Sequence, residues 1–219
     1  VWNYYLVQRR TAYEQVGNTL NYHDCSKDMA VLKKTLTWLN EVDSTALQSS
    51  LRDLDIAYQN FFRRVKQGDK PGYPRFKSKH GCRKSYKSKC VNANIKVQEN
   101  AVQLPKLGPV KCSVSKKVKG RILSATVSQN PSGKYFVSLC CTDVETTPLP
   151  STEAAVGLDM GLKAFAITSD GVEYPNHKYL VKSKKKLAKL QRQLSRKSKG
   201  SSRREKARIK VARLHEHVT

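Results

Sequence analysis

Apolar residues in positions 1–67 recur at steps of three and four, the spacing of one face of a helix. The clearest stretch follows Ser44, a good N-cap residue, and ends at Gly68, a natural helix stop. Its apolar positions are Leu47, Leu51, Leu54, Tyr58, Phe61 and Val65. Such a stripe is typical of packing between helices, so we expect a helical region with a shared core and no cofactor site.

Residues 91–147 instead show the alternation of short strands. One stretch alternates around a turn at Glu99–Asn100. The next, RILSATVSQNPSGKYFVSLCC, has the pattern of a hairpin with residues 130–133 as its loop. Half-buried strand positions are expected at Val127, Tyr135, Val137 and Leu139. This pattern predicts a small β-barrel or a curled sheet.

The last third combines strands and helices. After a linker-like segment at 148–153, AAVGLDM is nearly all apolar, which is typical of a central buried strand. KAFAITS predicts the next strand, and Ser169-Asp170-Gly171 predicts a tight turn after it. Residues 181–217 return to a helical pattern with a break at 199–202, which favours an antiparallel helical hairpin. The predicted fold class is therefore α+β.

Charge changes the picture, because 42 Lys and Arg face 17 Asp and Glu, giving a formal net charge of +25. This excess indicates a polyanionic partner, with nucleic acid as the leading candidate and an anionic membrane surface as the alternative. No apolar stretch approaches about 18 residues and no signal peptide is recognisable. We therefore expect a cytoplasmic protein without a membrane partner.

The basic residues concentrate in the predicted helical hairpin, which has 15 Lys and Arg between Lys182 and Arg213 against the single acid Glu205. A solvated charged face is the usual explanation of such a run. This imbalance favours nucleic-acid contact instead, because unrelieved repulsion weakens an isolated helix. The candidate contact residues here are Lys184, Lys185, Lys186, Lys189, Arg192, Arg196, Lys197, Arg203 and Arg204.

A second basic segment, residues 69–90, interleaves cations with Tyr73, Phe76 and Tyr86. Cations beside aromatic rings suit phosphate contact combined with base stacking. The alternative is a solvated loop whose aromatic residues anchor it to the core. Candidate phosphate contacts in this segment are Arg75, Lys77 and Lys79.

The six cysteines form no CxxC pair, so no zinc site is predicted within the chain. We expect reduced thiols, as is usual in a cytoplasmic protein.

Asp159 is the one acid in the apolar run GLDMGLKAFAIT. A carboxylate fixed on a strand can hold Mg²⁺ beside a scissile phosphate, Gly161 would let a nucleic-acid backbone come close, and Lys163 would reach a phosphate. The alternative is a structural aspartate that caps backbone N–H groups. The residues alone leave both interpretations open, and one aspartate does not make a two-metal site.

GLDMGLKAFAITSDG at residues 157–171 resembles the first nuclease motif of the TnpB (OrfB) family of transposon-encoded RNA-guided nucleases, which are related to type V CRISPR effectors. The resemblance extends in order through Pro74–Lys79 (PRFKSK), Leu104–Gly108 (LPKLG) and the basic segment Lys186–Ser201. An earlier family pattern is matched by Trp38, Leu39, Val42, Ser44, Leu47, Gln48, Leu51, Asp53, Leu54, Ala57, Tyr58, Phe61 and Phe62.

The resemblance implies a helical recognition lobe at 1–70, most of a wedge β-barrel at 71–150, and the start of a RuvC-like RNase H-fold domain with a basic hairpin at 151–219. It implies that Asp159 is the first of three catalytic carboxylates that work with Mg²⁺. The implied partners are a guide RNA and a target DNA, and the implied setting is the prokaryotic cytoplasm beside the nucleoid.

In this family the second and third carboxylates and a CxxC…CxxC zinc ribbon normally follow later, whereas 60 residues follow Asp159 here. Glu205 and Glu216 lie on the basic hairpin, so neither is assigned as a catalytic partner. We therefore expect an N-terminal part of a family member, with Mg²⁺ bound only in the complete protein and no cleavage by these residues alone. The alternative is a remnant that binds DNA or RNA and cuts nothing.

Overall fold

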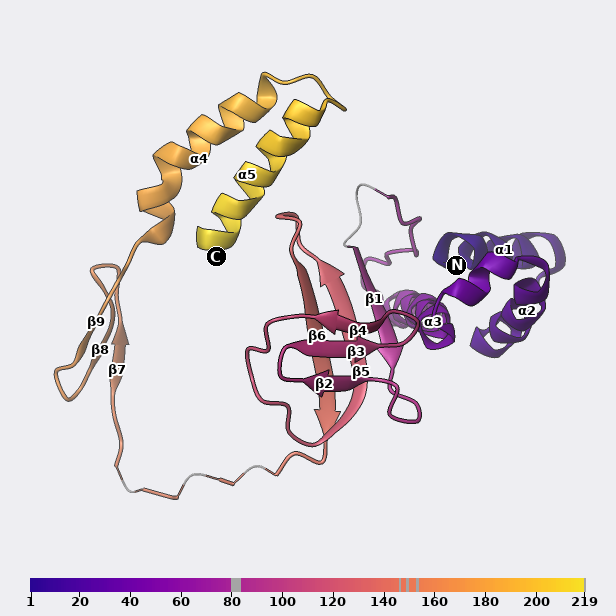
Figure 1. Cartoon of the computed structure of the whole chain (residues 1–219), viewed down its shortest axis with the longest axis horizontal. Coiled ribbons are helices and arrows are strands. Elements are labelled where there is room, and N and C mark those ends of the chain that lie inside the picture. The colour runs from indigo at the N-terminus through magenta and orange to yellow at the C-terminus, as the bar shows by residue number, and fades with distance from the viewer. Residues whose placement is uncertain (80–83, 146, 149, 153, 219) are drawn as a thin grey trace. The chain divides into compact units, whose positions relative to one another are not determined.

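The computed structural model describes residues 1–79, 84–145, 147–148, 150–152 and 154–218 (Figure 1). The chain forms two compact units, Val1–Asn130 with Tyr135–Glu145, and Pro131–Lys134 with Thr146–Thr219. Helices and antiparallel sheets occur in separate segments, so the predicted α+β class is confirmed. The predicted domain boundary at residue 70 lies inside the first unit and stays a prediction.

The first unit begins with helices, as the apolar spacing predicts. They are α1 (Trp2–Val16), α2 (Tyr22–Thr35), the 3₁₀ helix η1 (Thr37–Glu41) and α3 (Ser44–Gln67). The predicted N-cap of α3 was wrong by one residue. Asp43 is the cap, because its carboxylate accepts hydrogen bonds from the backbone N–H groups of Thr45 and Ala46. Gly68 ends α3 in the left-handed conformation, as expected.

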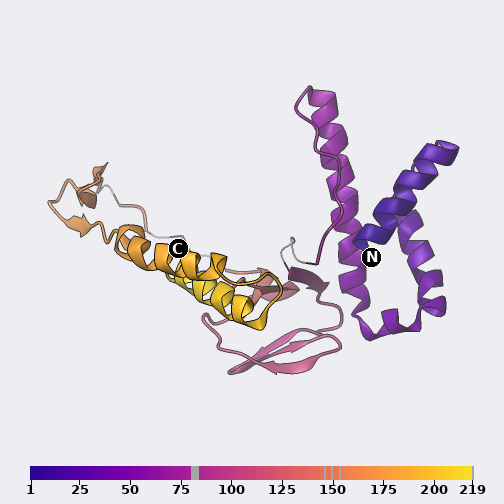
Figure 2. The ribbon, with the colours of Figure 1, turned by 90° about the horizontal axis from the view of Figure 1, so that it is seen from above.

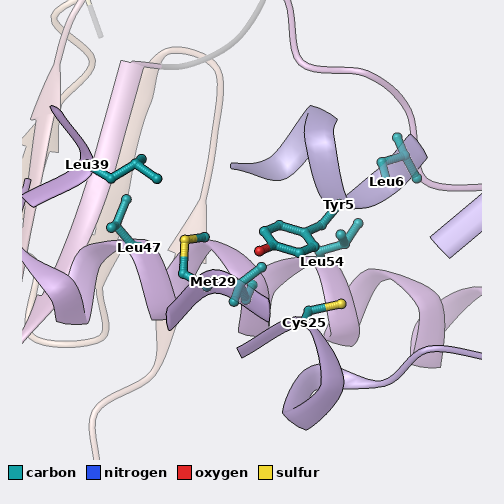
Figure 3. Close-up of a cluster of buried hydrophobic side chains, with 8 residues drawn as sticks. Tyr5, Leu6, Cys25, Met29, Leu39, Leu47 and Leu54 are labelled. Atoms are coloured by element: carbon teal, nitrogen blue, oxygen red, sulfur yellow. The ribbon is translucent and has the colours of Figure 1, made fainter. Parts of the chain in front are cut away.

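The core of these helices gathers residues from all of them (Figure 3). Its buried members are Tyr5, Leu6, Cys25, Met29, Leu39, Leu47, Leu51 and Leu54. The apolar stripe of α3 is buried only in its first half, because Tyr58 and Phe61 are half-buried and Val65 is 51% exposed. The spacing therefore predicted the helix correctly but not how far its packing extends.

Six strands follow in the same unit and form two antiparallel sheets, ordered β1-β5-β6 and β2-β3-β4. Their bounds are β1 (Lys84–Lys89), β2 (Lys96–Gln98), β3 (Ala101–Leu104), β4 (Gly108–Lys111), β5 (Arg121–Gln129) and β6 (Tyr135–Thr142). The predicted β5–β6 hairpin is confirmed. Ile95, Val102, Leu104 and Ala125 form a buried apolar cluster shared by the two sheets.

The predicted barrel is not closed. Each of the two sheets is an open set of three strands, and no strand pairing among the described residues joins one sheet to the other. The two sheets bury apolar side chains against each other in the shared cluster. This packing does not require the continuous backbone pairing of a closed barrel.

A polar network joins α3 to β1. The hydroxyl groups of Ser88 and Thr45 each donate to the Asp43 carboxylate at 2.6 Å, and the Lys89 backbone N–H donates to the Thr45 hydroxyl at 2.9 Å. Burial alone would raise the pKa of Asp43, but these hydroxyl groups and the two capping N–H groups lower its pKa overall. The ionised carboxylate is thus built into the fold at this junction.

The second unit contains a three-stranded antiparallel sheet of β7 (Leu158–Met160), β8 (Ala164–Thr168) and β9 (Glu173–Pro175). The predicted turn is confirmed, because the Gly171 N–H donates to the Thr168 carbonyl at 2.9 Å with Gly171 at φ +80°. The prediction of a central buried strand was wrong. β8 is the central strand, and β7 is an exposed edge strand whose Leu158 and Met160 are more than half exposed.

The predicted helical hairpin is confirmed as α4 (Tyr179–Ser195) and α5 (Ser202–Val218), which lie side by side in Figures 1 and 2. Leu214 is the buried residue of these two helices, and Leu187, Leu190 and Leu194 are half-buried. Within the described part of the chain, no helix is long and apolar enough to cross a membrane. Cys25, Cys90, Cys112, Cys140 and Cys141 are free thiols, while Cys82 lies outside the described residues.

Candidate nucleic-acid interface and metal-binding aspartate

Asp159 lies in the middle of β7, and the sheet register defines its neighbours. Asp159 pairs with Ile167 of β8, which in turn pairs with Glu173 of β9. Directly paired residues of antiparallel strands project to the same face of a sheet. Two carboxylates and an exposed apolar side chain therefore form one row across this face.

The Asp159 side chain is exposed. No described residue donates a hydrogen bond to its carboxylate or forms an ion pair with it. A capping aspartate would accept backbone N–H groups, as Asp43 does at the start of α3. Within the described residues, the capping alternative for Asp159 therefore has no donor to support it. Its geometry leaves the carboxylate available to a ligand.

The residues present supply only part of a metal site. Among the described residues, no group of three or more His, Cys, Asp and Glu side chains lies close enough to hold a metal. Asp159 and Glu173 are two strands apart, which corresponds to about 10 Å between their backbones, whereas Mg²⁺ binds oxygen at about 2.1 Å. The described sheet thus offers Asp159 as a single ligand.

The connection from β7 to β8 holds Gly161 and Lys163, which are both exposed. A Cβ atom at Gly161 would lie 3.4 Å from the carbonyl oxygen of Ala164, which is an ordinary van der Waals contact, so the turn itself does not require glycine here. The amide of Asn176 donates to the Leu162 carbonyl at 3.2 Å and ties this turn to the segment after β9. Lys163 therefore projects from a turn that is held at both ends.

Most of the basic residues predicted on the hairpin are exposed along α4 and the start of α5. These are Lys184, Lys185, Lys186, Lys189, Arg192, Arg196 and Arg203. Arg204 differs, because its Nη1 donates to the carbonyl oxygens of Leu194 at 3.0 Å and Lys197 at 2.9 Å. It satisfies the end of α4 from the start of α5 and thereby holds the hairpin turn together.

The predicted phosphate contacts Arg75, Lys77 and Lys79 are exposed on the segment that runs back along α3 (Figure 2). This segment is anchored to α1: the Trp2 indole N–H donates to the Arg75 carbonyl at 3.0 Å, and Asn3 exchanges two hydrogen bonds with the Lys77 backbone. The Lys77 ammonium lies 3.8 Å from the centre of the Trp2 ring. The backbone of this segment is therefore anchored to α1, and the Lys77 ammonium, the group expected to contact a phosphate, itself lies on the Trp2 ring.

Sequence reasoning missed a hollow of about 700 Å³ lined by α1, the segment after it, the second half of α3 and Tyr73. Three of its aromatic residues, Tyr58, Phe61 and Phe62, lie in the part of α3 that the apolar spacing assigned to helix packing. The signal in the sequence was the change from leucine to aromatic residues halfway along the stripe.

Comparison with known proteins agrees with the pattern of motifs. Residues 138–219 match the OrfB family, described as "Probable transposase". A protein of Streptomyces pristinaespiralis named "Putative RNA-guided DNA endonuclease" is 36% identical over 224 residues, which cover 100% of this chain and 54% of that protein.

A second relative, "Putative RNA-guided DNA endonuclease InsQ" of Escherichia coli (strain K12), is 39% identical over 180 residues. That alignment covers 81% of this chain and 42% of the relative. The chain belongs to the TnpB (OrfB) family. It spans about half the length of these two relatives of the TnpB family.

Proposed function

We propose that this TnpB-family chain is the nucleic-acid-binding part of a transposon-encoded RNA-guided DNA endonuclease, with guide RNA and target DNA as its partners. The observation that carries the proposal is the row of exposed cations on α4 and α5 in the same unit as Asp159. Cations ordered along a helical hairpin attract a phosphate backbone through counterion release. The names of the two relatives support RNA and DNA as the polyanions.

In the complete protein, Asp159 would hold Mg²⁺ together with carboxylates supplied from outside these 219 residues. Bound Mg²⁺ would supply charge stabilisation for phosphodiester hydrolysis. Asp159 contributes one fixed oxygen ligand on an edge strand, and Lys163 contributes a cation close to the same strand. The wedge and RuvC-like assignments of residues 71–150 and 151–219 belong to the same proposal.

Salt-dependent binding tests the proposal. The purified chain is titrated against single-stranded RNA and duplex DNA at several salt concentrations. A variant carrying Lys184→Ala, Lys185→Ala and Lys186→Ala is compared with a control that replaces three exposed lysines elsewhere, Lys27, Lys34 and Lys96. The hairpin variant should reduce the slope of log affinity against log salt for single-stranded RNA by about 2, at about 0.7 per phosphate contact.

Affinity that does not change with salt would contradict nucleic-acid binding through this hairpin. An equal loss in the control variant would show that the total charge matters and the hairpin does not.

A binding-only protein is the second candidate, favoured because no three His, Cys, Asp or Glu side chains of the described residues come together to hold a metal. The two candidates share the prediction that the 219-residue chain binds but does not cut DNA in Mg²⁺. The two candidates differ in what they require of the gene. The endonuclease requires a reading frame that continues into a strand bearing the second carboxylate, a Glu, then a CxxC…CxxC pair and a third carboxylate. Metal-dependent cutting by the purified chain that Asp159→Ala abolishes would overturn the prediction for both.

A further inference from the structure

The hollow in the helical part of the first unit combines aromatic rings with cations. It measures about 700 Å³, within the range of small-molecule sites. Its lining residues are Arg9, Arg10, Tyr13, Glu14, Thr19, Leu20, Tyr58, Phe61, Phe62 and Tyr73. Seven of these ten side chains end in an aromatic ring or a guanidinium group, and both are planar groups that stack on other planar groups.

The inner wall of this hollow is held in place. Arg9 is nearly buried, pairs with Asp55 at 2.7 Å, donates to the Leu20 carbonyl at 2.6 Å and lies 4.7 Å from the centre of the Tyr58 ring. The Tyr58 hydroxyl forms a 2.9 Å hydrogen bond with the Tyr73 hydroxyl. Tyr58 is therefore fixed by a cation, a hydroxyl and its own helix, so little conformational entropy remains to be lost when a ligand arrives.

The remaining rings extend from this fixed wall toward solvent. Tyr73 packs edge-on against both Tyr58 and Phe61, with ring centres 5.6 and 5.3 Å apart. Phe62 stacks near Tyr58 at 6.4 Å and 24°. Yet Tyr13, Phe62 and Tyr73 are 65%, 56% and 44% exposed. Clustered exposed rings of this kind mark an interaction site more often than a packing defect.

Charge identifies the occupant. Arg10 is on the lining with its side chain 59% exposed, and exposed Arg63, Arg64 and Lys66 follow Phe62 directly on α3. The Arg64 Nη1 atom lies 3.5 Å from the position that a Cβ atom would take at Gly72, the residue before Tyr73. The acid on the lining, Glu14, is paired with Arg10 at 2.7 Å. An apolar peptide has no negative charge to pair with these cations. A nucleotide has both a base that stacks on the rings and a phosphate that pairs with the cations.

We propose that this hollow binds an unpaired nucleobase of a single-stranded nucleic acid, stacked against Phe62, with its flanking phosphates on the exposed cations that follow Phe62 on α3. The inference rests on the proposed nucleic-acid-binding function and adds a base-binding site within the helical part of the chain. Stacking on an aromatic side chain is sequence-tolerant because every base has a π-face, so the site selects unpaired bases rather than a sequence.

The test compares oligouridylate with an abasic ribose-phosphate oligomer of the same length, and repeats the comparison with deoxyribose oligomers. The full chain is measured beside Phe62→Leu, which keeps apolar volume but removes the ring, and Phe62→Tyr, which keeps the ring. Phe62→Leu should weaken binding of the base-bearing oligomer by about fivefold or more, at about 5- to 150-fold per stacked base. It should leave binding of the abasic oligomer unchanged, and Phe62→Tyr should bind like the original chain.

A loss with either the ribose or the deoxyribose set supports the proposal and identifies the nucleic acid concerned. Equal losses for base-bearing and abasic oligomers, or no loss for either, would overturn it. In both of these cases salt-dependent binding by the unaltered chain leaves the proposed function standing. If the unaltered chain binds none of the oligomers, that result contradicts both the proposed function and this inference.

Discussion

The α3–β1 junction and the β7–β9 sheet each contain an aspartate, and the two carboxylates have opposite surroundings. Asp43 accepts hydrogen bonds from Ser88, Thr45 and two backbone N–H groups, and it joins a helix to a sheet. Asp159 is exposed on an edge strand, and no described residue bonds to it. One carboxylate is needed to build the fold, whereas nothing in the described fold requires the other.

The comparison extends to the packing around each aspartate. The first unit has two buried apolar clusters, whereas the sheet around Asp159 leaves Leu158, Met160 and Phe165 more than half exposed. This contrast agrees with the proposed metal-binding role of Asp159, which stays a proposal.

The largest expected difference is between the two kinds of packing. Leu54 is 1% exposed in the helical core, and Leu162 is 89% exposed beside β7. Leu54→Ala should lower the free energy of unfolding by about 2–5 kcal/mol because it leaves a cavity, whereas Leu162→Ala should change it by less than about 0.5 kcal/mol. Chemical denaturation of both variants measures this difference. A comparable loss in Leu162→Ala would show that the Leu162 side chain is packed, which would contradict the contrast.

Removal of the structural aspartate should have the next largest effect. Asp43→Ala removes an N-cap and leaves the Ser88 and Thr45 hydroxyl groups without their acceptor. We expect a loss of about 1–2 kcal/mol in the free energy of unfolding. Asp43→Asn should lose less, because asparagine also caps helices. Equal stability of Asp43→Ala and the unaltered chain would show that the hydrogen bonds of Asp43 do not stabilise the fold.

Acid should weaken the same junction. The pKa of Asp43 is lowered from its ordinary 3.8, so the contribution of the ionised carboxylate is fully present above that value. It is lost as the pH falls through the lower pKa of the folded state. Unfolding measured between pH 5 and pH 2 should therefore show a smaller loss of stability in Asp43→Asn than in the unaltered chain. Identical pH profiles would contradict this assignment.

The smallest expected effect belongs to Asp159. Asp159→Ala should change the free energy of unfolding by less than about 0.5 kcal/mol, because no described residue bonds to this side chain. A capping aspartate would instead contribute about 0.5–2 kcal/mol. Denaturation of Asp159→Ala beside Asp43→Ala gives the comparison directly. A loss in Asp159→Ala as large as in Asp43→Ala would restore the structural interpretation.

Local patterns predicted the elements well where neighbours in the sequence decide the outcome. The long helix that ends at Gly68, the hairpin around residues 130–133 and the turn at Gly171 all form as expected. Apart from the N-cap of α3, the predictions that failed concern partners distant in the sequence. The barrel is not closed, and the strand of Asp159 lies at an edge, because an apolar run shows that a strand can be buried but not what covers it.

The sequence by itself determined most of the elements, the excess of positive charge and the family to which the chain belongs, although strand β1 (Lys84–Lys89) was not predicted. These depend on composition, spacing and ordered motifs, which need no contact between distant residues. Only the tertiary structure separated Asp43 from Asp159, gave Arg204 a structural role at the end of α4, and gathered Tyr13, Phe62 and Tyr73 around one hollow. Burial, hydrogen-bond partners and concave surfaces arise when the chain brings remote segments together, and no local pattern records them.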